Sequence, residues 1–160
     1  MVAGATDAAG FTTAEIALMC ASHNGEDLHA KTASGMLEKL GYDIKYYECG
    51  SHAPYDQDTK FELIRNANDP TPLHNNCSGK HAGMLCLAKH LDADPSGYTQ
   101  VDHPVQQAIF KQIKKYSELD NFPLAVDGCS APVPFMPLYN IALMYQKLAS
   151  GDYEELNILY

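Results

Sequence analysis

The feature that most constrains the fold is a helical pattern that begins on a cluster of reactive side chains. In the segment "CSGKHAGMLCLAKHL", the apolar residues Met84, Leu85, Ala88 and Leu91 recur at helical spacing. We therefore expect a helix over residues 78–91. Its start, "CSGK", places a thiol, a hydroxyl and an amine where exposed backbone amides favour anions and thiolates.

Five further helices are predicted from their end signals. Thr12 and Glu15 form a capping-box pair, and Gly41 supplies a C-terminal stop. Proline is a favoured first residue of a helix. The predicted helices run from Thr12 to the break at Asn24-Gly25, over 26–40, over 59–66, from Pro104 through Tyr116, and over 137–149.

Strand signals are few. Residues 42–48, "YDIKYYE", are rich in β-forming residues, and a short strand in "PLAVDGCSAP" ends in a Gly-Cys turn. The predicted class is therefore α/β (α+β), mostly helical with little sheet. A chain of 160 residues is the size of one domain, so residues 1–160 are predicted to form a single domain.

Charge and cysteine content limit the partners. A formal charge of −9 and a pI near 5.0 argue against binding to nucleic acid or to an anionic membrane. The apolar run from Ile16 to Ala21 is too short to cross a bilayer, and no basic leader precedes it. The five cysteines are scattered, which suits a reducing cytoplasm better than a disulfide scaffold. We therefore predict a cytoplasmic protein.

Three side chains could form a metal site. Cys77 and Lys80 are three residues apart at a helix start, where their side chains can converge, and Cys129 follows the short strand. Two thiolates and a nitrogen can hold zinc with a fourth position open to water or substrate. A lysine ligand must lose its proton, which burial and a dication both favour. The alternative is that both cysteines pack as small buried residues and Lys80 is a surface charge.

Two polar residues outside this group are candidates for chemistry. Ser22 could be a nucleophile with a distant base, could hold substrate, or could be a turn residue before Asn-Gly. It cannot pair with His23, because adjacent residues do not face each other. Asp127 could orient the amino group of a ligand or could simply form its turn.

Three segments resemble one family, and the similarity that they mark covers nearly the whole chain in the same order. They are "CASHNGEDLH", "HNNCSGKHAGML" and "VDGCSAPVPFMPLYNIALMYQKLASG", which resemble the rhizobial-type L-asparaginases, or asparaginase II family. The resemblance implies a fold like that of serine β-lactamases and penicillin-binding transpeptidases. It also implies hydrolysis of L-asparagine to L-aspartate and ammonia by serine–lysine catalysis beside a zinc ion. A homodimer is expected.

The resemblance assigns roles to individual residues by their position in these segments. It implies Ser22 as an active-site serine, Cys77, Lys80 and Cys129 as zinc ligands, and His81, Asp127 and Lys80 as lining of the substrate pocket. The family also uses a Ser-x-x-Lys pair, and a further lysine that partners the serine at the position of Ser22. Neither is found here, so we expect an internal fragment of a longer asparaginase, with a truncated sheet and little activity alone. Its apolar tail, with Leu156 and residues 158–160, is expected to pack against something further.

Two other functions stay open from the sequence. The first is a thiol-dependent amidohydrolase with Cys77 as nucleophile and His81 as base. The second is a non-catalytic metal-binding or interaction domain. Inactivation of zinc-free protein by alkylation would favour the thiol enzyme, and absence of ammonia release from asparagine would favour the non-catalytic domain.

Overall fold

The computed structural model describes residues 4–157 of the 160. The described chain is mostly helical with one two-stranded antiparallel sheet, which agrees with an α+β class. The elements are α1 (Ala5–Ala8), α2 (Thr13–Cys20), α3 (Asp27–Leu40), η1 (Ile44–Tyr46), α4 (Gln57–Arg65), η2 (Pro72–His74), α5 (Ser78–His90), α6 (Pro104–Ser117), β1 (Leu124–Val126), β2 (Pro132–Pro134), α7 (Leu138–Ala149) and η3 (Glu154–Leu156).

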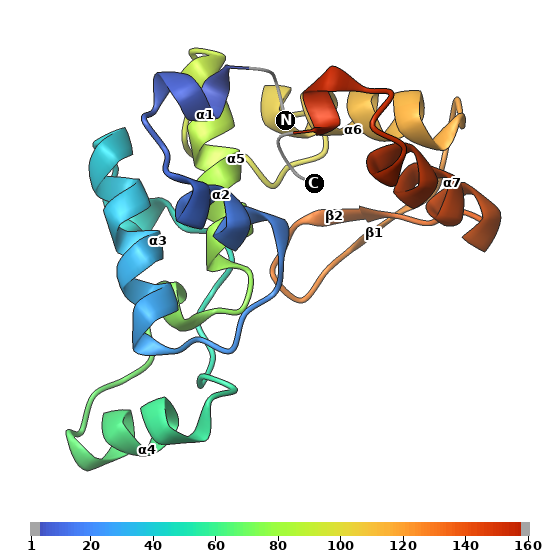
Figure 1. The fold of residues 1–160 in the computed structure, drawn as a ribbon. Coiled ribbons are helices and arrows are strands. Elements are labelled where there is room, and N and C mark those ends of the chain that lie inside the picture. Colours follow the sequence, from blue (N-terminus) through green and yellow to red (C-terminus); the bar gives the residue numbers. More distant parts are fainter. Residues whose placement is uncertain (1–3, 158–160) are drawn as a thin grey trace.

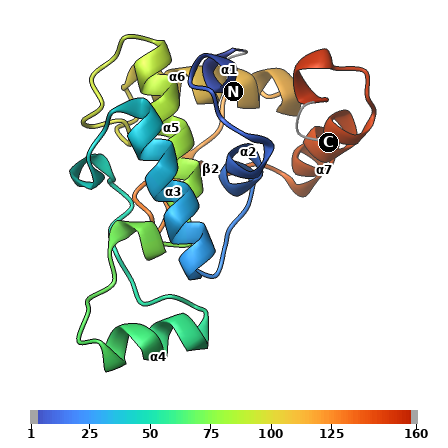
Figure 2. The same cartoon turned by 60° about the vertical axis from the view of Figure 1, so that its left-hand side comes forward.

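Helix α5 lies at the centre of the helical body, with α2 and α3 packed against it (Figures 1 and 2). Leu85 and Ala88 of this helix are fully buried. The approach of α2 depends on two glycines of α5. A Cβ atom at Gly79 would overlap the backbone carbonyl of Leu18, and one at Gly83 would crowd the side chain of Met19. Glycine at the first of these positions lets the two backbones meet.

The predicted capping box at the start of α2 and the predicted stop of α3 are confirmed, but α2 ends at Cys20, before the predicted break at Asn24-Gly25. The Thr12 hydroxyl accepts the backbone N–H of Glu15, and the Glu15 carboxylate accepts the backbone N–H of Thr12. Gly41 ends α3 in the left-handed conformation with φ of 70°. The N–H of Tyr42 then donates to the carbonyl of Leu37, which satisfies one of the last carbonyls of the helix.

The strand predicted over residues 42–48 is wrong. This segment contains the 3-10 helix η1, and no strand pairs with it in the described part of the chain. The Asp43 carboxylate accepts the backbone N–H of Lys45, and the backbone N–H of Tyr46 donates to the carbonyl of Asp43. These local bonds turn the chain, which outweighs the β-propensity of its tyrosines.

The second predicted strand is confirmed as β1, but it belongs to a hairpin. Its partner β2 pairs in the register Ala125↔Val133. The sequence did not indicate β2, because prolines at both of its ends argue against a strand. Pro132 and Pro134 have no N–H to donate to β1. The next residue, Phe135, donates its backbone N–H to the carbonyl of Pro123 and so extends the pairing of the hairpin.

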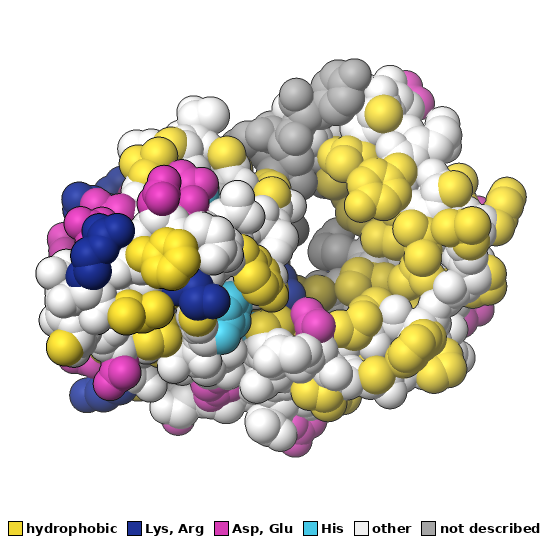
Figure 3. Space-filling view, turned by 90° about the horizontal axis from the view of Figure 1, so that it is seen from below, with side chains coloured by type: hydrophobic (Ala, Val, Ile, Leu, Met, Phe, Trp, Pro, Cys, Tyr) yellow, Lys and Arg dark blue, Asp and Glu magenta, His cyan; other side chains and the backbone are white. Residues whose placement is uncertain are grey.

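The C-terminal part exposes much more apolar surface than the helical body. Hydrophobic side chains gather over the half of the molecule that contains α7 and the hairpin (Figure 3). Leu138 and Val126 are 79% and 75% exposed.

Helix α4 stands away from the body on two extended segments (Figure 1), and no residue of α4 is buried. None of the described helices is long and apolar enough to span a membrane. The predicted packing of residues 158–160 concerns positions outside the described residues.

Candidate functional site

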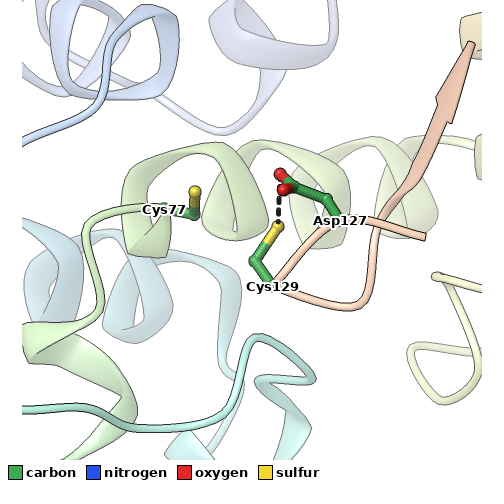
Figure 4. A group of neighbouring side chains, drawn as sticks. All are labelled: Cys77, Asp127 and Cys129. Atoms are coloured by element: carbon green, nitrogen blue, oxygen red, sulfur yellow. Dashed lines mark hydrogen bonds between the residues drawn. The ribbon is translucent and has the colours of Figure 1, made fainter. Parts of the chain in front are cut away.

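Two thiols and a carboxylate converge where the start of α5 meets the hairpin turn. The Cys77 sulfur, a carboxylate oxygen of Asp127 and the Cys129 sulfur all lie within 4.8 Å of one another (Figure 4). Cys77 is the residue directly before α5, and Asp127 and Cys129 belong to the turn after β1. The structure therefore brings together the two cysteines that the sequence placed far apart, and adds Asp127 to them.

The hairpin turn holds its donors through local bonds. The N–H of Asp127 donates to the carbonyl of Ala131, and the N–H of Ser130 donates back to the carbonyl of Asp127. The N–H of Gly128 donates to the Asp127 carboxylate at 2.8 Å. Cys129 is buried together with Ala131 in the main core, and its thiol donates to Asp127 Oδ2 at 3.4 Å. The turn is thereby anchored to the helical body at its tip.

Lys80 completes the group as a cation. Its Nζ atom lies 3.6 Å from Asp127 Oδ2, and both side chains are nearly half exposed. Burial lowers the pKa of Lys80, but the Cys129 and Cys77 thiols and the Asp127 carboxylate outweigh it, so the pKa is raised overall. The pKa of Asp127 is lowered, first by the N–H of Gly128, then by the Cys129 thiol and by Lys80. In this arrangement Lys80 and Asp127 are therefore an ion pair.

The chemistry of these donors fits zinc. Structural and catalytic zinc sites use cysteine sulfur at about 2.3 Å and nitrogen or carboxylate oxygen at about 2.0–2.2 Å. Ligands at those distances in a tetrahedron lie about 3.5 Å apart, and the group from Cys77 to Cys129 falls within 4.8 Å. Burial raises the pKa of the Cys77 thiol, while Lys80 opposes that shift. A bound dication would replace the thiol protons and the lysine proton.

The loop that carries Ser22 docks onto the segment before α5. Ser22 is exposed, and its Oγ accepts a hydrogen bond from the side-chain Nδ2 of Asn76 at 2.7 Å. The N–H of His23 donates to the carbonyl of Asn76 at 3.2 Å. Because Asn76 directly precedes Cys77, these two bonds join the loop of the predicted active-site serine to the residue next to the cysteine cluster.

Ser22 and His23 do not form a dyad, as predicted, because His23 binds a different serine. His23 Nε2 lies 2.9 Å from Ser78 Oγ, which resembles the spacing of a nucleophile and its base. The N–H of Gly25 donates to His23 Nδ1, so Nε2 carries the proton and donates to Ser78. Burial lowers the pKa of His23 to about 4, and Ser78 is fully buried. This pair therefore fastens the loop and is not a nucleophile with its base.

His81 is the residue after Lys80 in α5. It is fully buried, and its Nδ1 is 2.7 Å from the hydroxyl of Tyr98. That hydroxyl also accepts the N–H of Glu48. Burial lowers the pKa of His81 to about 3, and its Nε2 has no hydrogen-bond partner among the described residues. Contact of His81 with substrate stays a prediction, and the structure does not pair it with the Cys77 thiol.

Three polar residues of the site were missed in the sequence. Asn75 accepts the N–H of Cys77 at 2.8 Å and donates to the carbonyl of Cys49 at 2.9 Å, which shapes the loop before α5. Asn76 binds Ser22, and His52 lies against Asn76 at 3.0 Å. The "HNN" run directly before Cys77 was the available signal, because paired asparagines before a helix commonly serve as turn and capping residues.

The arrangement combines an ion pair and a candidate metal-binding group at one helix start and one hairpin turn with the exposed Ser22 hydroxyl, which is bonded to Asn76. The sequence profile of the family described as L-asparaginase II matches residues 1–157, which include every residue of this site. A comparison with curated proteins found no match. The profile covers nearly the whole chain, and the chain belongs to the L-asparaginase II family.

Proposed function

We propose that this protein hydrolyses the side-chain amide of L-asparagine to L-aspartate and ammonia, with Ser22 as the nucleophile. The observation that carries the proposal is the docking of the Ser22 loop on the residue before Cys77. It bonds an exposed hydroxyl to the residue directly before Cys77, and Cys77 belongs to the group that contains Asp127, the ion-pair partner of Lys80. Membership of the L-asparaginase II family supports the amide as the bond that is cleaved.

The proposed reaction proceeds through an ester. Ser22 Oγ forms a bond to the side-chain carbonyl carbon of asparagine, and its proton passes to a base. The carbon–nitrogen bond then breaks, and the nitrogen leaves as ammonia after taking up a proton. Water cleaves the resulting aspartyl ester, which releases aspartate and restores the Ser22 hydroxyl. In the family that the chain resembles, the base is a neutral lysine.

Opposite charges at Lys80 and Asp127 suit an amino-acid substrate. The Asp127 carboxylate can accept the α-ammonium group, and the α-carboxylate can bind the Lys80 ammonium in the metal-free protein, or the charge of a zinc ion when Lys80 is a neutral ligand. The side-chain amide of a substrate held at both groups would extend away from them. Asparagine and glutamine differ in how far that amide extends, so the distance from this ion pair to Ser22 would decide which is preferred.

We further propose a zinc site formed by Cys77, Lys80 and Cys129, with a fourth position for water or substrate. The supporting observation is the set of donors at the start of α5, in which Asp127 provides a further carboxylate. A bound zinc ion would supply positive charge that orients substrate and favours the neutral form of a nearby lysine. The serine β-lactamase-like fold is proposed on the same family resemblance.

The cellular setting is also part of the proposal. All five cysteines are free, which supports a reducing cytoplasm. A homodimer is supported by the exposed apolar side chains of α7, of which Leu138 is 79% and Tyr139 is 75% exposed. Sedimentation of the purified protein at several concentrations tests this state, and a monomer throughout would contradict it.

Ammonia release from L-asparagine tests the function. No serine of the chain is followed three residues later by lysine, so we expect residues 1–160 alone to release ammonia slowly. A version that also carries the family's Ser-x-x-Lys segment and the further lysine that partners Ser22, called the extended version below, should hydrolyse asparagine, and Ser22→Ala should remove most of that activity. Activity of the extended version that survives Ser22→Ala but is lost on alkylation of Cys77 would favour the thiol enzyme. No ammonia from the extended version would favour a non-catalytic domain.

A further inference from the structure

The side chain of Asn76 links Ser22, the proposed nucleophile, to His52 in the loop before α4. Asn76 Nδ2 donates to Ser22 Oγ at 2.7 Å, and Asn76 Oδ1 lies 3.0 Å from His52 Nε2. The backbone N–H of Asn76 is also 3.3 Å from the same ring nitrogen. The three residues come from separate loops, and each polar end of the Asn76 side chain meets one of the other two.

We propose that Asn76 is the positioning residue of the Ser22 hydroxyl, a role that rests on the proposed function. A hydroxyl oxygen can accept a hydrogen bond while its own proton is donated elsewhere. The Asn76 amide therefore occupies an acceptor site of Ser22 and leaves the proton free to pass to a base. A donor on Oγ also stabilises the negative charge that builds up as the proton leaves.

His52 sets the direction in which Asn76 points. Its Nδ1 lies 2.7 Å from the carbonyl of Ala53, an acceptor, so Nδ1 carries a proton and the ring plane is held. Asn76 Oδ1 is likewise an acceptor, so its contact with Nε2 is a hydrogen bond only when Nε2 also carries a proton, and that bond turns the amide nitrogen of Asn76 toward Ser22. The N–H of His23, which donates to the Asn76 carbonyl, holds the backbone of Asn76 against the Ser22 loop. Asn76 is thus fixed from both sides before any substrate arrives.

Replacement of Asn76 by aspartate tests the hydrogen bond to Ser22 without changing the size of the side chain. Asn76→Asp keeps the size of the side chain but removes both amide protons, so it cannot donate to Ser22 and would compete for the serine proton. We expect Asn76→Asp to lower kcat for asparagine about 100-fold with little change in KM, because the lost bond reaches the nucleophile and not the substrate. The same change at the exposed Asn68, in the loop after α4, controls for the added charge and should leave kcat unchanged.

A second measurement does not depend on turnover. In the 15N-labelled 160-residue chain, the side-chain amide resonances of Asn76 should shift on Ser22→Ala and on His52→Ala, and should stay unchanged on Asn68→Asp. No shift on Ser22→Ala would overturn the contact. Wild-type-like kcat in Asn76→Asp, measured in the extended version, would overturn the positioning role. If that version releases no ammonia while the resonances shift, the proposed function fails, and the contact with Ser22 stands.

Discussion

The helical body and the hairpin hold their parts of the site in different ways. In the body, the helix that presents Cys77 and Lys80 is surrounded, and Leu85 at its centre is fully buried. In the hairpin, both strands are largely exposed, and Val126, next to Asp127, is 75% exposed. The turn enters the core through Cys129 and Ala131. One wall of the site is therefore part of a packed core, and the other is a two-stranded hairpin anchored to that core at its turn.

Because of this difference, the metal donors of the helix and those of the hairpin should depend differently on a bound metal. A donor on a packed helix is positioned whether or not a metal is bound. A donor on an exposed two-stranded hairpin needs further contacts, since such a hairpin is marginally stable alone. A zinc ion that joins Cys77 to Cys129 would therefore order the hairpin more than the body. Mutations in the two regions should separate metal binding from folding.

The largest expected effect is on metal content. Cys129→Ser should reduce zinc from about one ion per chain to a trace, because the hairpin then offers only a carboxylate. Cys77→Ser should do the same from the body side. The exposed Cys20 is a matched control, and Cys20→Ser should leave zinc unchanged. Metal analysis after dialysis makes the comparison, and full zinc content in both site variants would show that these cysteines are not ligands.

Substitution of Lys80 tests how the body contributes to the same site. Arginine keeps the positive charge but does not deprotonate in the accessible pH range, so it cannot replace a neutral amine ligand. Lys80→Arg should therefore weaken zinc binding and asparagine hydrolysis about as much as Lys80→Ala. Both are measured side by side, with hydrolysis in the extended version. Near-normal zinc and activity in Lys80→Arg alone would mean that Lys80 acts through its charge, as in its pair with Asp127.

A pair of glycines contrasts the packing of the two regions. Gly79→Ala adds a methyl group against the backbone carbonyl of Leu18, and we expect a loss of about 2 kcal/mol in the free energy of unfolding. Gly128 of the hairpin turn has no atom within 4 Å of an added Cβ. Gly128→Ala should therefore change stability by less than about 0.5 kcal/mol. Urea unfolding measures both, and equal losses would contradict the contrast.

Acid should weaken the bond between the Ser22 loop and the body. Burial lowers the pKa of His23 from 6.5 to about 4, so between these values the unfolded chain binds more protons than the folded one. The stability due to neutral His23 is present above pH 6.5 and is lost as the pH falls through about 4. We expect His23→Gln to reduce the loss of unfolding free energy between pH ~7 and ~4.5 by about 1 kcal/mol. The exposed His90 is the control, and an equal change in His90→Gln would contradict the assignment.

The sequence predicted the helical body better than the hairpin region. The capping box at Thr12 and the stop at Gly41 are local signals, and local signals decide where these helices end. The 3-10 helix after Gly41 and the strand between Pro132 and Pro134 were missed. In both, hydrogen bonds to particular neighbours outweigh the propensity of the residues, and a single sequence does not display those neighbours.

The residues of the site were also predicted unevenly from the sequence. The convergence of Cys77 and Lys80 followed from their spacing at a helix start. Cys129 was a candidate third donor from the sequence, but no spacing fixed its approach, and only the family resemblance favoured it over a packing role. Asn76 was missed because its bond to Ser22 joins two loops and leaves no periodic pattern. The docking of the Ser22 loop depends on a buried bond from His23 to Ser78, which spacing does not reveal.

X-ray absorption at the zinc edge of the reconstituted 160-residue chain tests most directly whether body and hairpin form one metal site. The account predicts two sulfur ligands at about 2.3 Å and lighter nitrogen or oxygen ligands at about 2.0–2.2 Å. Cys77→Ser and Cys129→Ser should each remove one sulfur from any zinc that remains bound. A spectrum with no sulfur ligand, or with the same two sulfurs in both variants, would contradict the account.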